Sequence, residues 1–73
     1  MNRILLRPSG QDKDVYNLIL GGPNIDYDKI SISSEEFAKF FYSLTMRTDI
    51  IFGDIIWMSK YRSERVMLFL YLR

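Results

Sequence analysis

Alternating and near-continuous hydrophobic runs near the start of the chain predict a β-hairpin. Residues 3–7 and 15–20 are rich in Leu, Ile, Val and Tyr, and the segment between them, residues 8–14, contains Pro, Gly and Asp, which favour turns. In residues 15–20 both alternating sets of side chains are mostly apolar, so we expect this strand to be covered on both faces. Gly21-Gly22-Pro23 is expected to end it.

The hydrophobic pattern changes to a helical period after residue 33. Ser33 is placed to accept a hydrogen bond from the amide of Glu36, and Glu36 to reach back to Ser33, while Ile32 is placed to pack on the first helical turn. This capping box predicts a helix over residues 34–45. Its apolar face, which we assign to the core packed against a sheet, consists of Phe37, Phe40, Phe41 and Leu44.

Two more strands are expected in the second half. Residues 49–61 are β-branched and aromatic, with Gly53-Asp54 predicting a bulge or bend, and residues 65–72 form a last strand after a polar break. The predicted fold class is α+β: a mostly antiparallel four-stranded sheet with one helix packed on it, in the order β-β-α-β-β. The 73 residues contain no internal repeat and no linker, so we expect a single domain over 1–73.

Composition excludes several kinds of chemistry. The chain has no His and no Cys, which removes thiol nucleophiles, imidazole bases and the usual zinc sites. The closely spaced pairs Asp12/Asp14 and Asp26/Asp28 lack the Gly and Glu positions of a calcium loop and are predicted to be solvated turn residues. No glycine-rich phosphate-binding motif is present. The residues therefore predict no complete catalytic site and no metal.

Charge and hydropathy bear on location and partners. The net charge is +1, and the cluster of Lys60, Arg62 and Arg65 is interpreted as a solvated strand end, so we expect no nucleic-acid binding. The longest apolar run, residues 66–72, is too short to span a membrane, and we expect a cytoplasmic protein without a membrane segment. Since this run has no internal charge, we expect self-association, or binding of a partner chain, through strand 65–72.

The segment over residues 45–62, TMRTDIIFGDIIWMSKYR, resembles the middle part of FAD-dependent aromatic-ring monooxygenases, the family of p-hydroxybenzoate and phenol hydroxylases. A Trp-x-Ser-x-aromatic-Arg element of that family is matched by Trp57, Ser59, Tyr61 and Arg62. The preceding hairpin and helix follow the order of elements in the family, so the resemblance covers most of the chain.

This resemblance implies an enzyme in which reduced FAD reacts with O₂ and the flavin hydroperoxide hydroxylates a phenolic ring. The substrate-binding residues that it implies are Arg7, Tyr16, Trp57 and Arg62. The family's N-terminal Gly-rich unit and its Gly-Asp-Ala-Ala-His element, which hold FAD, have no counterpart here, and residues 64–71 keep only the strand that leads to the second of them. We therefore expect a fragment or degenerate member of the family that binds no FAD and is inactive alone.

Two alternatives remain open from the residues themselves. Tyr16 and Trp57 also fit core packing, and Arg7 and Arg62 also fit surface charges at strand ends. The chain as a whole also fits a small free-standing protein-interaction module without catalytic activity. A remnant of a larger fold should leave an apolar sheet face uncovered, whereas such a module should carry polar residues there.

Overall fold

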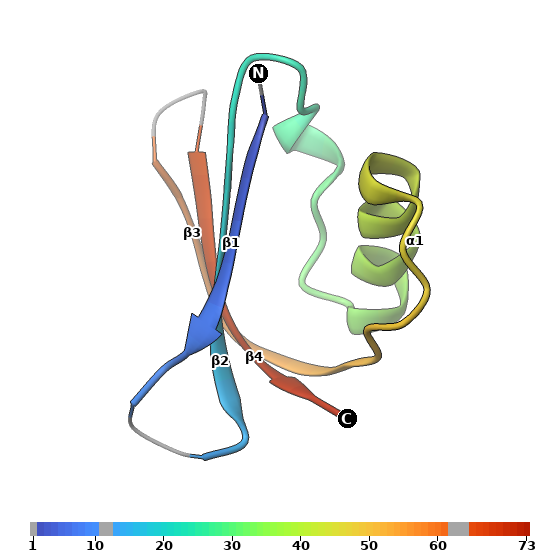
Figure 1. Ribbon diagram of the computed structural model, residues 1–73. Coiled ribbons are helices and arrows are strands. Elements are labelled where there is room, and N and C mark those ends of the chain that lie inside the picture. The colour runs from blue at the N-terminus through green and yellow to red at the C-terminus, as the bar shows by residue number, and fades with distance from the viewer. Residues whose placement is uncertain (1, 11–12, 62–64) are drawn as a thin grey trace.

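The computed structural model describes residues 2–10, 13–61 and 65–73, and these form one antiparallel sheet with one α-helix (Figure 1). The elements are β1 (Arg3–Pro8), β2 (Val15–Gly21), the short 3-10 helix η1 (Tyr27–Lys29), α1 (Ser34–Thr45), β3 (Phe52–Tyr61) and β4 (Arg65–Leu72). The strand order is β1-β2-β4-β3, and each neighbouring pair is antiparallel. The predicted α+β fold in the order β-β-α-β-β is confirmed.

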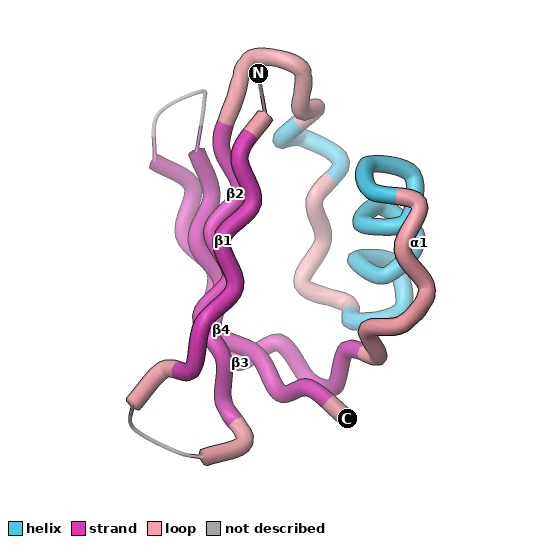
Figure 2. Tube along the Cα trace, in the orientation of Figure 1, coloured by secondary structure: helices cyan, strands magenta, loops and turns pink. Residues whose placement is uncertain are grey.

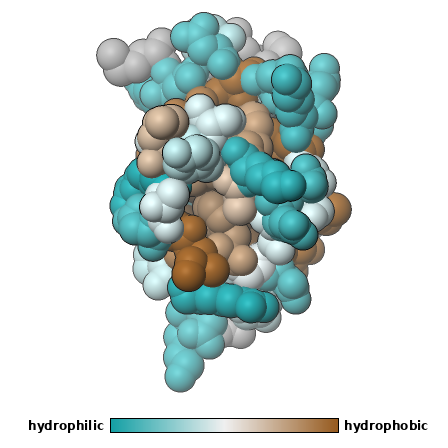
Figure 3. Space-filling model, turned by 90° about the vertical axis from the view of Figure 1, so that its right-hand side faces the viewer, coloured by the Kyte–Doolittle hydropathy of each residue, from teal (hydrophilic) through white to brown (hydrophobic). Residues whose placement is uncertain are grey.

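The described part of the molecule has two layers. The helix α1 and the segment that links it to β2 lie on the same side of the sheet, and the other side of the sheet is bare (Figures 1 and 2). Seen from the α1 side, hydrophilic groups surround smaller apolar areas (Figure 3). The expectation that β2 is covered on both faces is wrong, because a single helix and its linker are too small to form two layers.

The segment between β2 and α1 contributes to the core, which the sequence pattern did not indicate. Ile25 and Ile30 are buried on either side of η1. The Asp26 side chain caps η1 by accepting a hydrogen bond from the backbone N–H of Asp28 at 3.2 Å. The hydroxyl of Tyr27 donates to the carbonyl of Gly22 at 2.8 Å, which fastens this segment to the end of β2.

The helix α1 begins and ends at the predicted residues, but its start uses only half of the predicted capping box. The Ser33 hydroxyl accepts from the Glu36 amide at 3.4 Å, as expected. The amide of Ser33 instead donates to the hydroxyl of Ser31 at 3.1 Å, and the Glu36 carboxylate pairs with Lys39 at 3.6 Å. Ile32 is exposed and adds little to the core. The Ser33 amide therefore donates to the Ser31 hydroxyl and not to the predicted Glu36 side chain.

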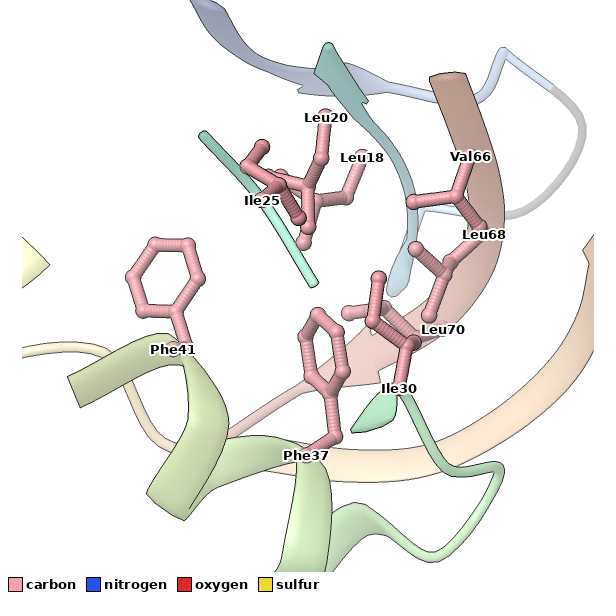
Figure 4. Packing of buried hydrophobic residues seen from close by; sticks show 9 residues of the cluster. All are labelled: Leu18, Leu20, Ile25, Ile30, Phe37, Phe41, Val66, Leu68 and Leu70. Atoms are coloured by element: carbon pink, nitrogen blue, oxygen red, sulfur yellow. The ribbon is translucent and has the colours of Figure 1, made fainter. Parts of the chain in front are cut away.

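The core lies between α1 and the helix-facing side of the sheet (Figure 4). Its buried members are Leu18, Leu20, Ile25, Ile30, Phe37, Phe41, Val66, Leu68 and Leu70, with Phe40 and Leu44 packed at its border. The predicted apolar helix face is therefore confirmed as core. Phe52 of β3 holds the helix in place: its ring lies edge-on to Phe37 and Phe41, with centroids 5.2 and 5.1 Å away.

The strand β3 starts three residues later than predicted and contains the expected irregularity. Its register against β4 shifts between Phe52 and Ile55 and again between Ile55 and Trp57. Gly53 lies in this region so close to β4 that a Cβ added to it would stand 2.9 Å from the Cβ of Tyr71. The bulge predicted at Gly53-Asp54 is confirmed, and the close approach of the two strands is the reason that glycine stands there.

The self-association or partner binding expected through strand 65–72 assumed that the backbone of this strand is unpaired, and that premise is wrong. The strand β4 is hydrogen-bonded to β2 on one side and to β3 on the other, so its backbone is paired along both edges. Val66, Leu68 and Leu70 are fully buried beneath α1. The long apolar run marks a central strand, and the edges of the sheet are β1 and β3. No helix in the described residues is long and apolar enough to cross a membrane.

Candidate functional site

The candidate site is the sheet face that points away from α1, which we call the open face. Residues paired across antiparallel strands share a face, and side chains alternate along each strand. Leu18 and its partner Leu68 belong to the core, so the pairs on either side of them belong to the open face. By this register the open face consists of Arg3, Leu5, Arg7, Val15, Asn17, Ile19, Trp57, Ser59, Arg65, Met67, Phe69 and Tyr71.

The middle of the open face is apolar and aromatic. Leu5, Trp57 and Tyr71 are 48%, 44% and 37% exposed, and Ile19, Met67 and Phe69 are half-buried. The rings of Trp57 and Phe69 are in contact, with centroids 5.5 Å apart and planes tilted by 50°. Because no other element of the described chain lies over these side chains (Figure 2), they form an apolar surface that faces solvent.

The charged side chains that the regular register places on the open face are Arg3, Arg7 and Arg65. Arg3 and Arg65 are both paired with Gly21 of β2 and so flank a position without a side chain, while Arg7 is paired with Asn17. The acidic residue Asp54 lies at the bulge of β3, where it and Gly53 stand opposite Tyr71 outside the regular register. The ion pairs in the described residues are Lys39 with Glu36 and Arg47 with Asp49, and none of the three open-face arginines takes part in them. The surface is therefore apolar with a cationic border.

Asn17 is the buried polar side chain of the open face, and the sequence analysis missed it. It is 4% exposed, because it sits on an inner strand between Arg7 of β1 and Phe69 of β4. Its Nδ2 donates to the carbonyl of Leu68 at 3.4 Å, whereas its Oδ1 is buried without a hydrogen-bond partner. A polar residue inside the otherwise apolar run of β2 was the available signal. Buried acceptors without partners are uncommon in folded proteins.

The residues implied by the family resemblance are only partly brought together. Arg7 and Trp57 lie on the open face in one row with Asn17 and Phe69, but on opposite edge strands, about 14 Å apart by strand spacing. Tyr16 pairs with Leu70 and therefore lies on the α1 side. Arg62 lies outside the described residues. The interpretation of Trp57 as a core residue is wrong, because it lies on a face that no second layer covers.

The remaining charged groups do not form a second site. Asp26 serves as the cap of η1, and Asp12 lies outside the described residues. Within the described ranges no group of three or more His, Cys, Asp or Glu residues could hold a metal ion. Arg47 donates two hydrogen bonds to Asp49, at 3.0 and 2.6 Å, and these bonds lower the pKa of the Asp49 carboxyl. This exposed pair lies in the link between α1 and β3.

Comparisons with protein-family models, with curated proteins and with solved structures found no match.

Proposed function

We propose that this chain is the substrate-domain portion of an FAD-dependent monooxygenase that hydroxylates aromatic, phenolic compounds, and that it is inactive by itself. The observation that carries the proposal is the apolar open face. Full burial of a large apolar side chain stabilises a fold by about 1.5–3 kcal/mol relative to full exposure. The open face leaves three such side chains partly exposed, those of Leu5, Trp57 and Tyr71. Such a surface is expected where the rest of a larger fold and an aromatic ligand pack against the sheet, and a free-standing module would carry polar residues there.

The residues of the open face are suited to hold an aromatic ring. Trp57, which belongs to the element that resembles the family, lies against Phe69 and offers a flat apolar surface. Arg7, in the same row, supplies a positive charge that attracts a phenolate. In this proposal the chain supplies the substrate wall, and the flavin supplies the oxygen chemistry from another part of the enzyme.

The residues of this chain do not fit FAD itself. Dinucleotides are held by a glycine-rich turn before a helix, whose N-terminal amides bind the pyrophosphate. The helix α1 has Glu35 and Glu36 in its first turn, and these carboxylates repel a phosphate group. Titrating the chain with FAD and following flavin fluorescence should therefore give no saturable quenching. Micromolar binding at one site per chain would contradict this part of the proposal.

A chimeric enzyme tests the activity. The corresponding segment of a phenol hydroxylase is replaced by this chain, and phenol-dependent NADPH oxidation and formation of the hydroxylated product are measured. We expect the chimera to hydroxylate phenol and Trp57→Ala in the chimera to raise the KM for phenol. Tyr42→Ala, at an exposed position of α1, is the matched control that should leave the KM unchanged.

The DNA around the coding sequence gives an independent test. Upstream, we expect it to encode a strand, a Gly-x-Gly-x-x-Gly turn and a helix, and downstream a Gly-Asp followed by small residues and His. Unrelated genes on both sides, together with a chain that unfolds cooperatively as a monomer, would favour the interaction module instead.

A further inference from the structure

The strand β1 is a regular sheet edge to which another strand can be added. Of the two edge strands, β3 has two register shifts, which bend a strand and interrupt its row of hydrogen-bonding groups. The strand β1 is paired with β2 without a shift from Arg3↔Gly21 to Pro8↔Tyr16, so its backbone is regular over its whole length. The outer side of β1 faces no other strand of the described chain.

The register also identifies which backbone groups of β1 point outward. The N–H of Ser9 donates to the carbonyl of Val15 at 3.0 Å. Hydrogen-bonded pairs recur at every second residue of an antiparallel ladder, so the odd-numbered residues of β1 are bonded to β2. The N–H groups of Ile4 and Leu6 therefore point away from β2, in the plane of the sheet. A strand placed outside β1 would meet two donors and the carbonyls next to them.

The side chains of β1 decide what kind of strand fits. Leu5 stands between Arg3 and Arg7 on the open face, while Ile4 and Leu6 stand on the α1 side. Neither arginine is in an ion pair of the described residues. On the open face, a strand added to β1 would therefore lie beside a positive charge, an apolar side chain and a second positive charge. On the α1 side it would lie beside apolar side chains only.

A second copy of the chain fits this edge poorly. If two β1 strands paired antiparallel about Leu5, Arg3 of one copy would stand opposite Arg7 of the other, twice over, and like charges directly opposed destabilise a sheet. A slip by one residue would place the side chains on the wrong faces. Pairing about Leu6 keeps five residues of each strand, but it sets each Arg7 opposite Leu5 without a partner charge and places Pro8, which has no N–H, opposite Ile4. The arginines therefore act against self-pairing in the register centred on Leu5, and in the register centred on Leu6 each Arg7 lacks an opposite charge that an acidic segment would supply.

We propose that β1 binds an extended acidic segment of another polypeptide, which adds to the sheet as a fifth strand. The segment carries carboxylates at the two positions beside Arg3 and Arg7, an apolar residue beside Leu5, and β-branched residues beside Ile4 and Leu6. Each arginine forms a charge-assisted hydrogen bond to a carboxylate, and the backbone of the segment pairs with the outward groups of Ile4 and Leu6. This interaction uses the edge of the sheet and does not depend on the proposed function.

The test uses the full chain and a fluorescein-labelled peptide, Thr-Glu-Val-Val-Val-Glu-Thr, in which the pattern reads the same in both directions. We expect saturable binding by fluorescence anisotropy, and binding about tenfold weaker for the peptide with Lys in place of both Glu residues. The double variant Arg3→Glu, Arg7→Glu should reverse this preference. Equal binding of the acidic and the basic peptide, or no binding of either, would overturn the proposal.

A backbone variant separates strand addition from simple charge attraction. Ile4→Pro removes an outward N–H but no hydrogen bond to β2, and proline is tolerated at such edge positions. Ile4→Ala is the matched control, since it shortens the same side chain and keeps the N–H. We expect Ile4→Pro to bind the acidic peptide at least tenfold more weakly than Ile4→Ala, with both variants folded by circular dichroism. Equal affinity of the two variants would show that β1 does not pair with the peptide.

Discussion

Replacing the buried Asn17 by leucine should make the isolated chain more stable. Asn17 is 4% exposed, and its Oδ1 is buried without a hydrogen-bond partner. A buried acceptor that lost its water and gained no partner costs about 1–3 kcal/mol. The hydrogen bond that the side chain does make, Nδ2 to the carbonyl of Leu68, is 3.4 Å long and near the outer limit for such a bond. It contributes less than the usual value of about 1 kcal/mol.

The unsatisfied Oδ1 lowers the free energy of unfolding and the long Nδ2 hydrogen bond raises it, and the effect of the Oδ1 is the larger. Leucine has nearly the same shape as asparagine and brings its apolar atoms next to Phe69 on the open face. We expect Asn17→Leu to raise the free energy of unfolding by about 1–2 kcal/mol. For a domain of this size each kcal/mol raises the melting temperature by about 4–8 °C.

Urea unfolding followed by circular dichroism and by the fluorescence of the single tryptophan, Trp57, measures this change. Asn24→Leu, at an exposed turn position, is the control and should alter stability by no more than about 0.5 kcal/mol. An Asn17→Leu chain that is less stable than the wild type would refute the reasoning. That result would mean that the Oδ1 of Asn17 in the wild-type chain has a hydrogen-bond partner, such as an ordered water.

Three further predictions concern the core, the bulge and the surface ion pair. Leu68→Ala removes a fully buried side chain from the central strand β4 and should destabilise the chain by about 2–5 kcal/mol in urea unfolding; a smaller loss would mean that the core collapses around the change. Gly53→Val should lower the melting temperature, because its Cβ would stand 2.9 Å from that of Tyr71, and an unchanged value would show that the bulge can widen. Asp49 should titrate below the usual range of an aspartate in carboxyl NMR spectra, and Arg47→Ala should return its pKa to that range. Since the pKa is lowered in the folded chain, the pair favours folding above the unfolded-state pKa and ceases to do so as the pH falls through the folded-state pKa; a pKa unaffected by Arg47→Ala would contradict this.

Local patterns in the sequence determined the elements. The helical spacing of Phe37, Phe41 and Leu44 and the Ser33 cap placed α1 correctly, because both act within one or two turns of the chain. Gly53-Asp54 marked the bulge for the same reason. The acceptor for the Ser33 amide was predicted wrongly. The hydroxyl of Ser31 and the carboxylate of Glu36 can both accept this hydrogen bond, and the folded backbone decides which of them does so.

The tertiary structure decided which strands are inside the sheet, and with that the candidate site. A run of apolar residues such as 66–72 is compatible with an exposed strand or a central one, and only the pairing of β4 with both β2 and β3 made it central. That order made β1 and β3 the edges of the sheet. It also placed Arg7, Asn17, Phe69 and Trp57, which are far apart in the sequence, in one row of the open face, and put Tyr16 on the other face. Such neighbours arise from strand order and register, which are set by contacts between distant segments and leave no mark in any one of them.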